Sequence, residues 1–292
     1  MGTLLALDLA VFHRHAHAPT LREAARWSVF IIAVSLAFGG FVWWQLGPQR
    51  ALEYYTGFLV EKALSVDNLF VFILLFRYFA VPAGAQPTVL KWGIFGAMLM
   101  RGVMIGVGAL LLHEFEWIIW VFGAIIVVTG LRMFRESEER IEPEHNPLVR
   151  LARRYLPFAN AYDGDRFTLR TTDGRRLFTP LLLVVLIVEW TDLVFAIDSI
   201  PAVFAITDDP FIVYSSNIFA ILGLRALFFL LAGMLERFTL LKPAVAGILV
   251  FIGAKMLAAQ WITVPTGLSL ALIATTLTGA VTLSLLRERR AA

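Results

Sequence analysis

Three carboxylates lie inside one long apolar stretch of the sequence, where an acid is costly. The stretch covers residues 179–207, and its acids are Glu189, Asp192 and Asp198. A membrane-spanning helix needs about 20 apolar residues, and an acid at its centre costs about 2.5–3.5 kcal/mol on insertion scales. We therefore expect these side chains to face the protein interior or a wet path. Pro201 should free a backbone carbonyl and kink the helix beside Asp198, which suggests an ion site.

The spacing of these acids limits how they can share a site. Glu189 and Asp192 are three residues apart and lie on one face of a helix. Asp192 and Asp198 are six residues apart, which rotates the second by roughly 240° around a straight helix. Either the helix is broken near Pro201, or the two acids line successive positions of a path.

A second stretch, residues 61–72, repeats this pattern. Glu61 and Asp67 are spaced as Asp192 and Asp198 are, and each second acid is followed by a polar residue, Asn68 or Ser199. In the same order, Ile94, Phe95, Arg101, Gly130 and Met133 match Ile218, Phe219, Arg225, Gly253 and Met256. Each copy holds three apolar runs, and three is odd, so the copies should be inverted. Inverted repeats are typical of transporters that bind near the midplane and alternate access.

The predicted spans contain more acids than deep cations. The deep cations are Arg101 and Arg225, while Lys62 and Lys255 could reach water by snorkelling. The excess negative charge suits a divalent cation, protons, or both. The alternative is that acids and arginines only join helices, but buried pairs contribute little net stability. The candidate metal ligands are Glu61, Asp67, Asn68, Glu189, Asp192 and Asp198.

The donor types narrow the ion. These ligands are all oxygen donors, which suit Mn²⁺, Mg²⁺ or Ca²⁺, whereas zinc and copper prefer cysteine or histidine. The sequence contains no cysteine, and none of its five histidines lies at the centre of a predicted span. No Gly-Lys-Ser/Thr phosphate loop is present, so we expect no ATP-driven pumping. We expect a transporter and not an enzyme.

The amino-acid composition indicates the structural class of the protein. Of the 292 residues, 59% are hydrophobic and 16% are charged, against about 25% charged in a soluble domain. We predict an all-α polytopic membrane protein with about eight to nine transmembrane helices. A net charge of +3 gives no reason to expect nucleic-acid binding. The predicted parts are 1–55, N-terminal helices with a truncated first span; 56–134, repeat 1; 135–178, a cytoplasmic loop; 179–260, repeat 2; and 261–292, a C-terminal helix with a basic tail.

The distribution of basic residues predicts the orientation. Alternate connecting segments, 47–55, 113–115, 208–210 and 261–265, hold only one basic residue, Arg50. The other connections are rich in arginine and lysine, which places the loop and the C-terminus in the cytoplasm. Within the loop we expect a short amphipathic helix at 146–155 and a hairpin at 167–177 that turns at 173–174. This loop is either a docking or regulatory element or a surface connector.

The sequence resembles the TerC/Alx family of integral membrane proteins. The resemblance is carried by EKALSVDNLFVF at 61–72, EWTDLVFAIDSIPAVFAIT at 189–207, DPFIVYSSNIFAILGLRAL at 209–227 and EPEHNPLVR at 142–150. It covers nearly the whole chain and implies a LysE-like transporter fold, Mn²⁺ export and metal-site acids at Glu61, Asp67, Glu189, Asp192 and Asp198. The chain departs from the family before residues 7–14, where the first half of a transmembrane helix is missing.

The hypothesis from sequence is a bacterial inner-membrane Mn²⁺ exporter that works by alternating access, with proton antiport as its driving force. Asp67 and Asp198 would bind the ion, helped by Asn68 and Asp192. Glu61 and Glu189 would exchange protons, and the two deep arginines would hold the acids. One alternative is a Ca²⁺ transporter. Another is a non-transporting partner, which assists insertion or metalation of secreted proteins through the loop at 135–178.

Overall fold

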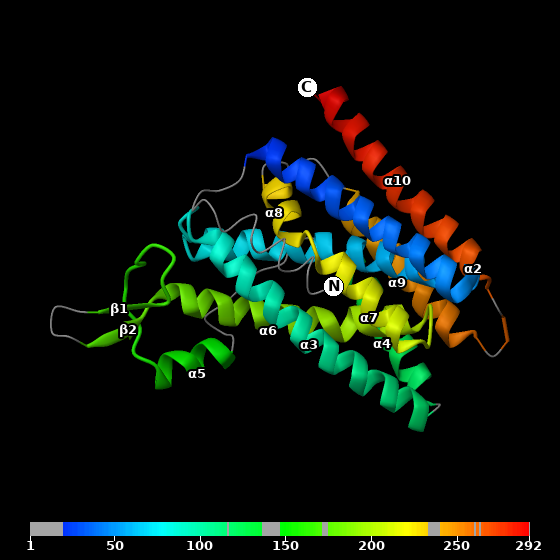
Figure 1. Ribbon diagram of the computed structural model, residues 1–292, viewed down its shortest axis with the longest axis horizontal. Helices are drawn as coiled ribbons and strands as arrows, with labels where there is room; N and C mark the ends of the chain where they lie inside the picture. Colours follow the sequence, from blue (N-terminus) through cyan, green and yellow to red (C-terminus); the bar gives the residue numbers. More distant parts are fainter. Residues whose placement is uncertain are drawn as a thin grey trace.

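The chain folds into a bundle of long helices with a small β-hairpin at one end (Figure 1). The computed structural model describes residues 20–115, 117–135, 147–170, 175–232, 240–259, 261–262 and 264–291. Within them, five helices are long and apolar enough to span a membrane, or six if one bent pair of shorter helices counts as a span. The predicted class of helical membrane protein is confirmed. The N-terminal residues 1–19, which include the predicted truncated first span, lie outside the described residues.

The helices follow the predicted apolar runs closely. They are α2 (Leu21–Tyr78), α3 (Gln86–Glu114), α4 (Ile118–Arg135), α5 (Pro147–Tyr155), α6 (Pro180–Phe204), α7 (Pro210–Ile221), α8 (Leu224–Ala232), α9 (Leu241–Leu257) and α10 (Thr266–Ala291). The predicted amphipathic helix of the polar loop is α5. The predicted hairpin is formed by β1 (Thr168–Arg170) and β2 (Arg176–Phe178), and its turn lies outside the described residues.

Helix α2 consists of two segments that fold back on each other. Gly47 has φ 87°, in the left-handed region that glycine adopts without strain. Pro48 follows, where its fixed φ suits the first position of a new helix. The Tyr54 hydroxyl then donates to the Ser35 carbonyl at 3.0 Å, which joins the two segments. The predicted connector at 47–55 is therefore mostly helical, because the turn needs only one non-helical residue.

The apolar stretch that follows α6 is divided between two helices, α7 and α8, and this break was not predicted from the sequence. Helices α7 and α8 are bent by 40°, and Gly223 between them has φ 83°. A Cβ at Gly223 would also lie 3.1 Å from Ile31 Cγ2. The break frees carbonyls at the negative end of α7, and the Lys62 ammonium donates to the Ala220 carbonyl at 3.0 Å.

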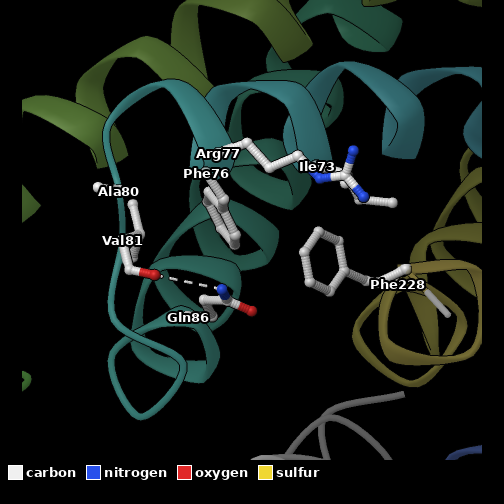
Figure 2. Close-up of a pocket in the computed structure, with 8 residues that line it drawn as sticks. Ile73, Phe76, Arg77, Ala80, Val81, Gln86 and Phe228 are labelled. Atoms are coloured by element: carbon white, nitrogen blue, oxygen red, sulfur yellow. Dashed lines mark hydrogen bonds between the residues drawn. The ribbon is translucent and has the colours of Figure 1, made fainter.

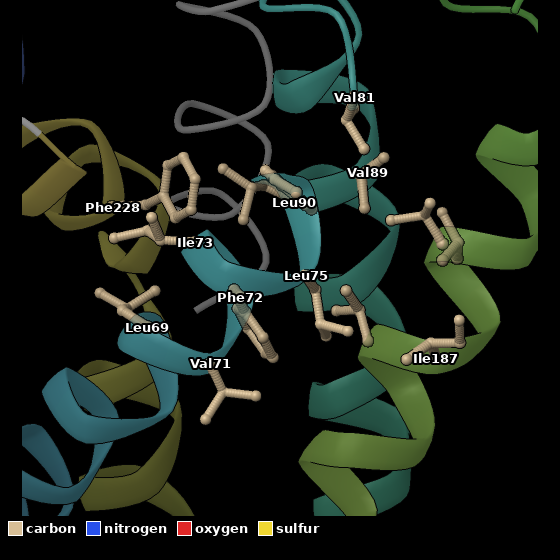
Figure 3. Packing of buried hydrophobic residues seen from close by; sticks show 14 of the residues in the cluster. Leu69, Val71, Phe72, Ile73, Leu75, Val81, Val89, Leu90, Ile187 and Phe228 are labelled. Atoms are coloured by element: carbon tan, nitrogen blue, oxygen red, sulfur yellow. The ribbon is translucent and has the colours of Figure 1, made fainter. Parts of the chain in front are cut away.

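The largest buried apolar cluster lies where α2, α3, α6 and α8 meet (Figure 3). Figure 3 shows Leu90 of α3 beside Phe228 of α8, and Leu75 of α2 on the side of the cluster toward Ile187 of α6. These helices also carry most of the predicted site residues. The cluster therefore fixes the distances between the helices on which the acids lie.

Helices α4 and α9 approach so closely that their backbones touch. A Cβ at Gly253 would lie 2.9 Å from the Gly123 carbonyl oxygen, and one at Gly130 would lie 2.9 Å from the Ala246 oxygen. The predicted repeat matches Gly130 with Gly253, and at the same spacing it matches Gly123 with Ala246. Each contact is thus the counterpart of the other. This agrees with the repeat, whose inversion stays a prediction.

Substituting Gly253 by alanine should lower the free energy of unfolding by about 1–3 kcal/mol, because backbone atoms cannot move aside without separating α4 from α9. Gly106→Ala is the matched control, since a Cβ there meets nothing within 4 Å. Thermal unfolding of both purified variants in detergent measures the difference. Equal melting temperatures for the two variants would contradict the close packing.

Candidate functional site

The centre of the candidate site is Arg101 of α3, whose side chain is fully buried. Its Nη1 pairs with Glu61 of α2. Its Nη2 and Nε donate to the two carboxylate oxygens of Asp192 of α6, at 3.1 and 3.3 Å. One guanidinium therefore joins three helices through two carboxylates that are both buried.

Two neutral side chains complete this cluster. Arg101 Nη1 also donates to Asn217 Oδ1 of α7 at 2.7 Å and to Ser199 Oγ at 3.3 Å. The Asn217 amide in turn donates to Glu61 Oε2 at 3.5 Å. Asn217 is fully buried. The sequence indicates it as an oxygen donor inside a predicted span, where it follows two serines, but it was not one of the six candidate metal ligands.

The cluster carries an excess of negative charge. Glu61 and Asp192 share one arginine, so the group has a formal charge of −1 when both acids are ionised. The expected role of Arg101, to hold the acids in place, matches this geometry. Arg225, its counterpart in the second copy, is buried as well.

Glu189 lies one turn before Asp192 on α6 and is half-buried. Its carboxylate packs against Gly96 of α3, where any Cβ would overlap the carboxylate atoms. The absence of a side chain at Gly96 therefore leaves the space that the carboxylate of Glu189 occupies.

Asp198 is held by a different neighbour. It is half-buried and accepts a hydrogen bond from Thr129 Oγ1 of α4 at 2.8 Å. Helix α6 continues through Pro201 to Phe204, so of the two alternatives the helix broken near Pro201 is wrong. Pro201 falls in the last turn, where it removes a single hydrogen bond and the helix can persist. Asp192 and Asp198 consequently occupy successive positions, facing α3 and α4.

The first copy contributes two further predicted residues on α2. Asn68 is buried, whereas the side chain of Asp67 lies outside the described part of the structure. Ser65 is one turn after Glu61, on the same helix face. Its hydroxyl is buried and, within the described residues, has no hydrogen-bond partner. It is a spare oxygen next to the cluster.

The described side chains do not assemble a ready metal cage. Among described residues there is no group of three or more acids, histidines or cysteines that could hold a metal. A cavity of about 370 Å³ lies where α2 ends beside α8 (Figure 2). Its lining includes Phe76, Arg77 and Phe228, with Gln86 donating to the Val81 carbonyl at 3.3 Å. It holds no acid, so it is not the predicted ion pocket.

A second polar cluster lies at the start of the second segment of α2. Arg50 Nη1 contacts Glu53 at 2.7 Å and Thr207 at 3.1 Å, and Arg50 Nε lies 3.6 Å from Asp209. Asp208, which is 93% exposed, completes it at 3.5 Å. This cluster ties α2 to the connection between α6 and α7. This cluster was not predicted from the sequence, although Arg50 is the one basic residue in the connecting segments 47–55, 113–115, 208–210 and 261–265.

Comparison with known proteins places the chain in a family. The description "Integral membrane protein TerC family" matches residues 46–292. The chain is 46% identical over 288 residues to the "Uncharacterized membrane protein STKORF319" of Myxococcus xanthus, covering 99% of this chain and 90% of that one. It is 45% identical over 282 residues to the "Putative membrane-bound redox modulator Alx" of Escherichia coli K12, covering 94% and 88%. No solved structure matches. The chain belongs to the TerC family of integral membrane proteins.

Proposed function

We propose that this protein exports a divalent metal cation, foremost Mn²⁺, across the bacterial inner membrane by alternating access. The observation that supports it most is the buried cluster in which Glu61 and Asp192 share Arg101. Two buried acids that share one arginine leave a net negative charge, and holding the helices together does not require this charge. The orientation that goes with export, with the loop and C-terminus in the cytoplasm, rests on the distribution of basic residues.

The cation would compete with Arg101 for the carboxylates. In this conformation the guanidinium occupies oxygens of both Glu61 and Asp192, so an entering ion must draw at least one acid away. Asp67, Asp198 and Asn68 would supply further oxygen ligands, with Ser65 as a spare donor. Glu61 and Glu189 would take up protons as the metal leaves, since protonated acids release metal.

Alternating access needs two helix groups that can separate. Helices α2 and α7 are linked at three levels: Arg50 with Asp209, Glu61 with Asn217, and Lys62 with the Ala220 carbonyl. The break after α7 lets that helix move independently of α8. The link at Arg50 would close the outer side in this conformation.

A relative's printed name suggests a second candidate, redox modulation. This 292-residue sequence contains no cysteine, so its own side chains cannot carry thiol–disulfide exchange. A Ca²⁺ transporter remains the alternative within the same chemistry, because the ligands are oxygen donors that suit either ion.

Mn²⁺ flux into proteoliposomes tests the proposal. The purified wild-type protein should carry Mn²⁺ faster than empty vesicles do, and Asp198→Asn should slow this flux by about 10- to 100-fold, as loss of a metal-site group typically does. Glu114→Gln is the control, because this acid lies at the end of α3, its side chain is 67% exposed, and it belongs to neither the Arg101 nor the Arg50 cluster. The same flux measurements with Ca²⁺ in place of Mn²⁺ show which of the two ions the protein carries faster.

The partner alternative predicts the opposite pattern in cells. Deleting residues 136–177 would then abolish protection against Mn²⁺, while Asp198→Asn would leave protection intact. Equal flux by wild type and Asp198→Asn would refute the site assignment. Flux no greater than that of empty vesicles would refute transport.

A further inference from the structure

The small hairpin places two like charges directly opposite each other. In the register of β1 and β2, Arg170 pairs with Arg176. Like charges at opposed positions of an antiparallel pair destabilise it. Among the described residues, no carboxylate forms an ion pair with either arginine. The hairpin therefore keeps an unfavourable pair that an external anion would neutralise.

These arginines line a polar cavity of about 770 Å³. A third arginine, Arg166, also lines it and lies 3.7 Å from Asp163, the single acid of the lining. Three positive charges against one negative leave a formal excess of +2. The lining residues are Tyr162, Asp163, Arg166, Thr168, Leu169, Arg170 and Arg176.

The cavity is anchored to the ends of two membrane helices. The Tyr162 hydroxyl donates to the Phe79 carbonyl, just beyond α2, at 2.7 Å. Burial raises the pKa of the Tyr162 phenol, so it stays protonated and keeps this bond. Phe167 packs edge-on against Trp92 of α3, with ring centroids 6.1 Å apart. Trp92 is 47% exposed, and tryptophans near helix ends mark the membrane–water interface.

Figure 1 shows the hairpin beside α5 and the start of α6, at one end of the bundle. Together with the Trp92 contact, this places the arginines at the depth of lipid headgroups. The basic bias of the loop puts that end on the cytoplasmic side, where basic pockets bind anionic headgroups.

We propose that this cavity binds a phosphate group, as the headgroup of an anionic phospholipid or as a free phosphate compound. Arginine forks bind phosphate oxygens in bidentate fashion, and the two opposed guanidiniums can bind one phosphate from both sides. The bound anion removes the repulsion within the hairpin and fixes the loop against α2 and α3. The inference is independent of the transported ion.

Thermal unfolding of the full-length protein in detergent, without and with ligand, tests the proposal. The probes are dihexanoyl-phosphatidylglycerol, dihexanoyl-phosphatidylcholine and inorganic phosphate. Phosphatidylglycerol should raise the melting temperature and phosphatidylcholine should not, since a ligand stabilises the state that binds it. Stabilisation by inorganic phosphate alone would assign the site to a free phosphate compound.

The double variant Arg170→Gln/Arg176→Gln should weaken binding by at least about tenfold, because it removes charge-assisted hydrogen bonds. Its melting temperature without ligand should equal or exceed that of the wild type, since the like-charge pair is gone, and this separates lost binding from misfolding. The control Arg22→Gln/Arg26→Gln removes two exposed arginines of α2. Equal stabilisation of all three proteins, or of none, would overturn the proposal.

Discussion

Arg101→Ala should lower the free energy of unfolding by about 3–5 kcal/mol, because it leaves two buried carboxylates without their cation. Both Glu61 and Asp192 would then have to be protonated or hydrated inside the bundle. Asn217 and Ser199 would lose their donor as well. Chemical or thermal unfolding of the purified variant in detergent measures the loss. Arg77→Ala removes an exposed arginine of α2 and should change stability by no more than about 0.5 kcal/mol.

A triple variant separates charge from packing. Arg101→Met with Glu61→Leu and Asp192→Leu replaces every ionised group of the cluster by an apolar side chain of similar size. Replacing a buried ion pair by hydrophobic residues of similar volume is often neutral or stabilising, so this variant should regain most of the stability that Arg101→Ala loses. It should not transport. A triple variant as unstable as Arg101→Ala would show that shape, and not charge, determines the role of Arg101.

The sequence predicted the elements of the fold well, because apolar runs of bilayer length leave little choice of secondary structure. The helix breaks at Gly47 and Gly223 differ in how well the sequence predicts them. A helix end at Gly47 could be predicted because Pro48 follows it. Gly223 was missed because its neighbours, Leu222 and Leu224, are as apolar as a continuous span would be. Only its φ of 83° reveals the bend.

For the site, the sequence identified which residues are buried and charged but not which of them meet. Glu61, Asp192 and Arg101 were all singled out, and both acids contact the arginine. Their partner Asn217 belongs to a helix whose rotation no periodicity fixed, since the polar residues of α7, 215–217, are consecutive and therefore mark no single face. Asp198 was expected beside Asp192 if Pro201 broke the helix. The unbroken helix turns it toward Thr129 instead.

Arg50→Ala should raise the accessibility of the interface between α2 and α7 from the outer side of the membrane. Arg50 lies 3.6 Å from Asp209 and donates to Thr207 at 3.1 Å, and about a third of its side chain is exposed, so this link contributes about 0.5–1 kcal/mol. Losing it would shift an equilibrium between closed and open states by about two- to fivefold. Ser216 is a suitable reporter, because it is fully buried and a Cβ at Gly57 of α2 would lie 2.9 Å from its hydroxyl.

The absence of cysteine from the sequence makes Ser216→Cys the only thiol in the protein. A membrane-impermeant thiol reagent added outside should label Ser216→Cys slowly, and Arg50→Ala should speed this labelling by about two- to fivefold. Trp261→Cys, at a residue that is 74% exposed, controls for reagent access and should react at one rate in both backgrounds. An unchanged rate at Ser216→Cys would show that the Arg50 cluster does not hold the outer side closed. Faster labelling only from the cytoplasmic side would instead reverse the predicted orientation of the chain.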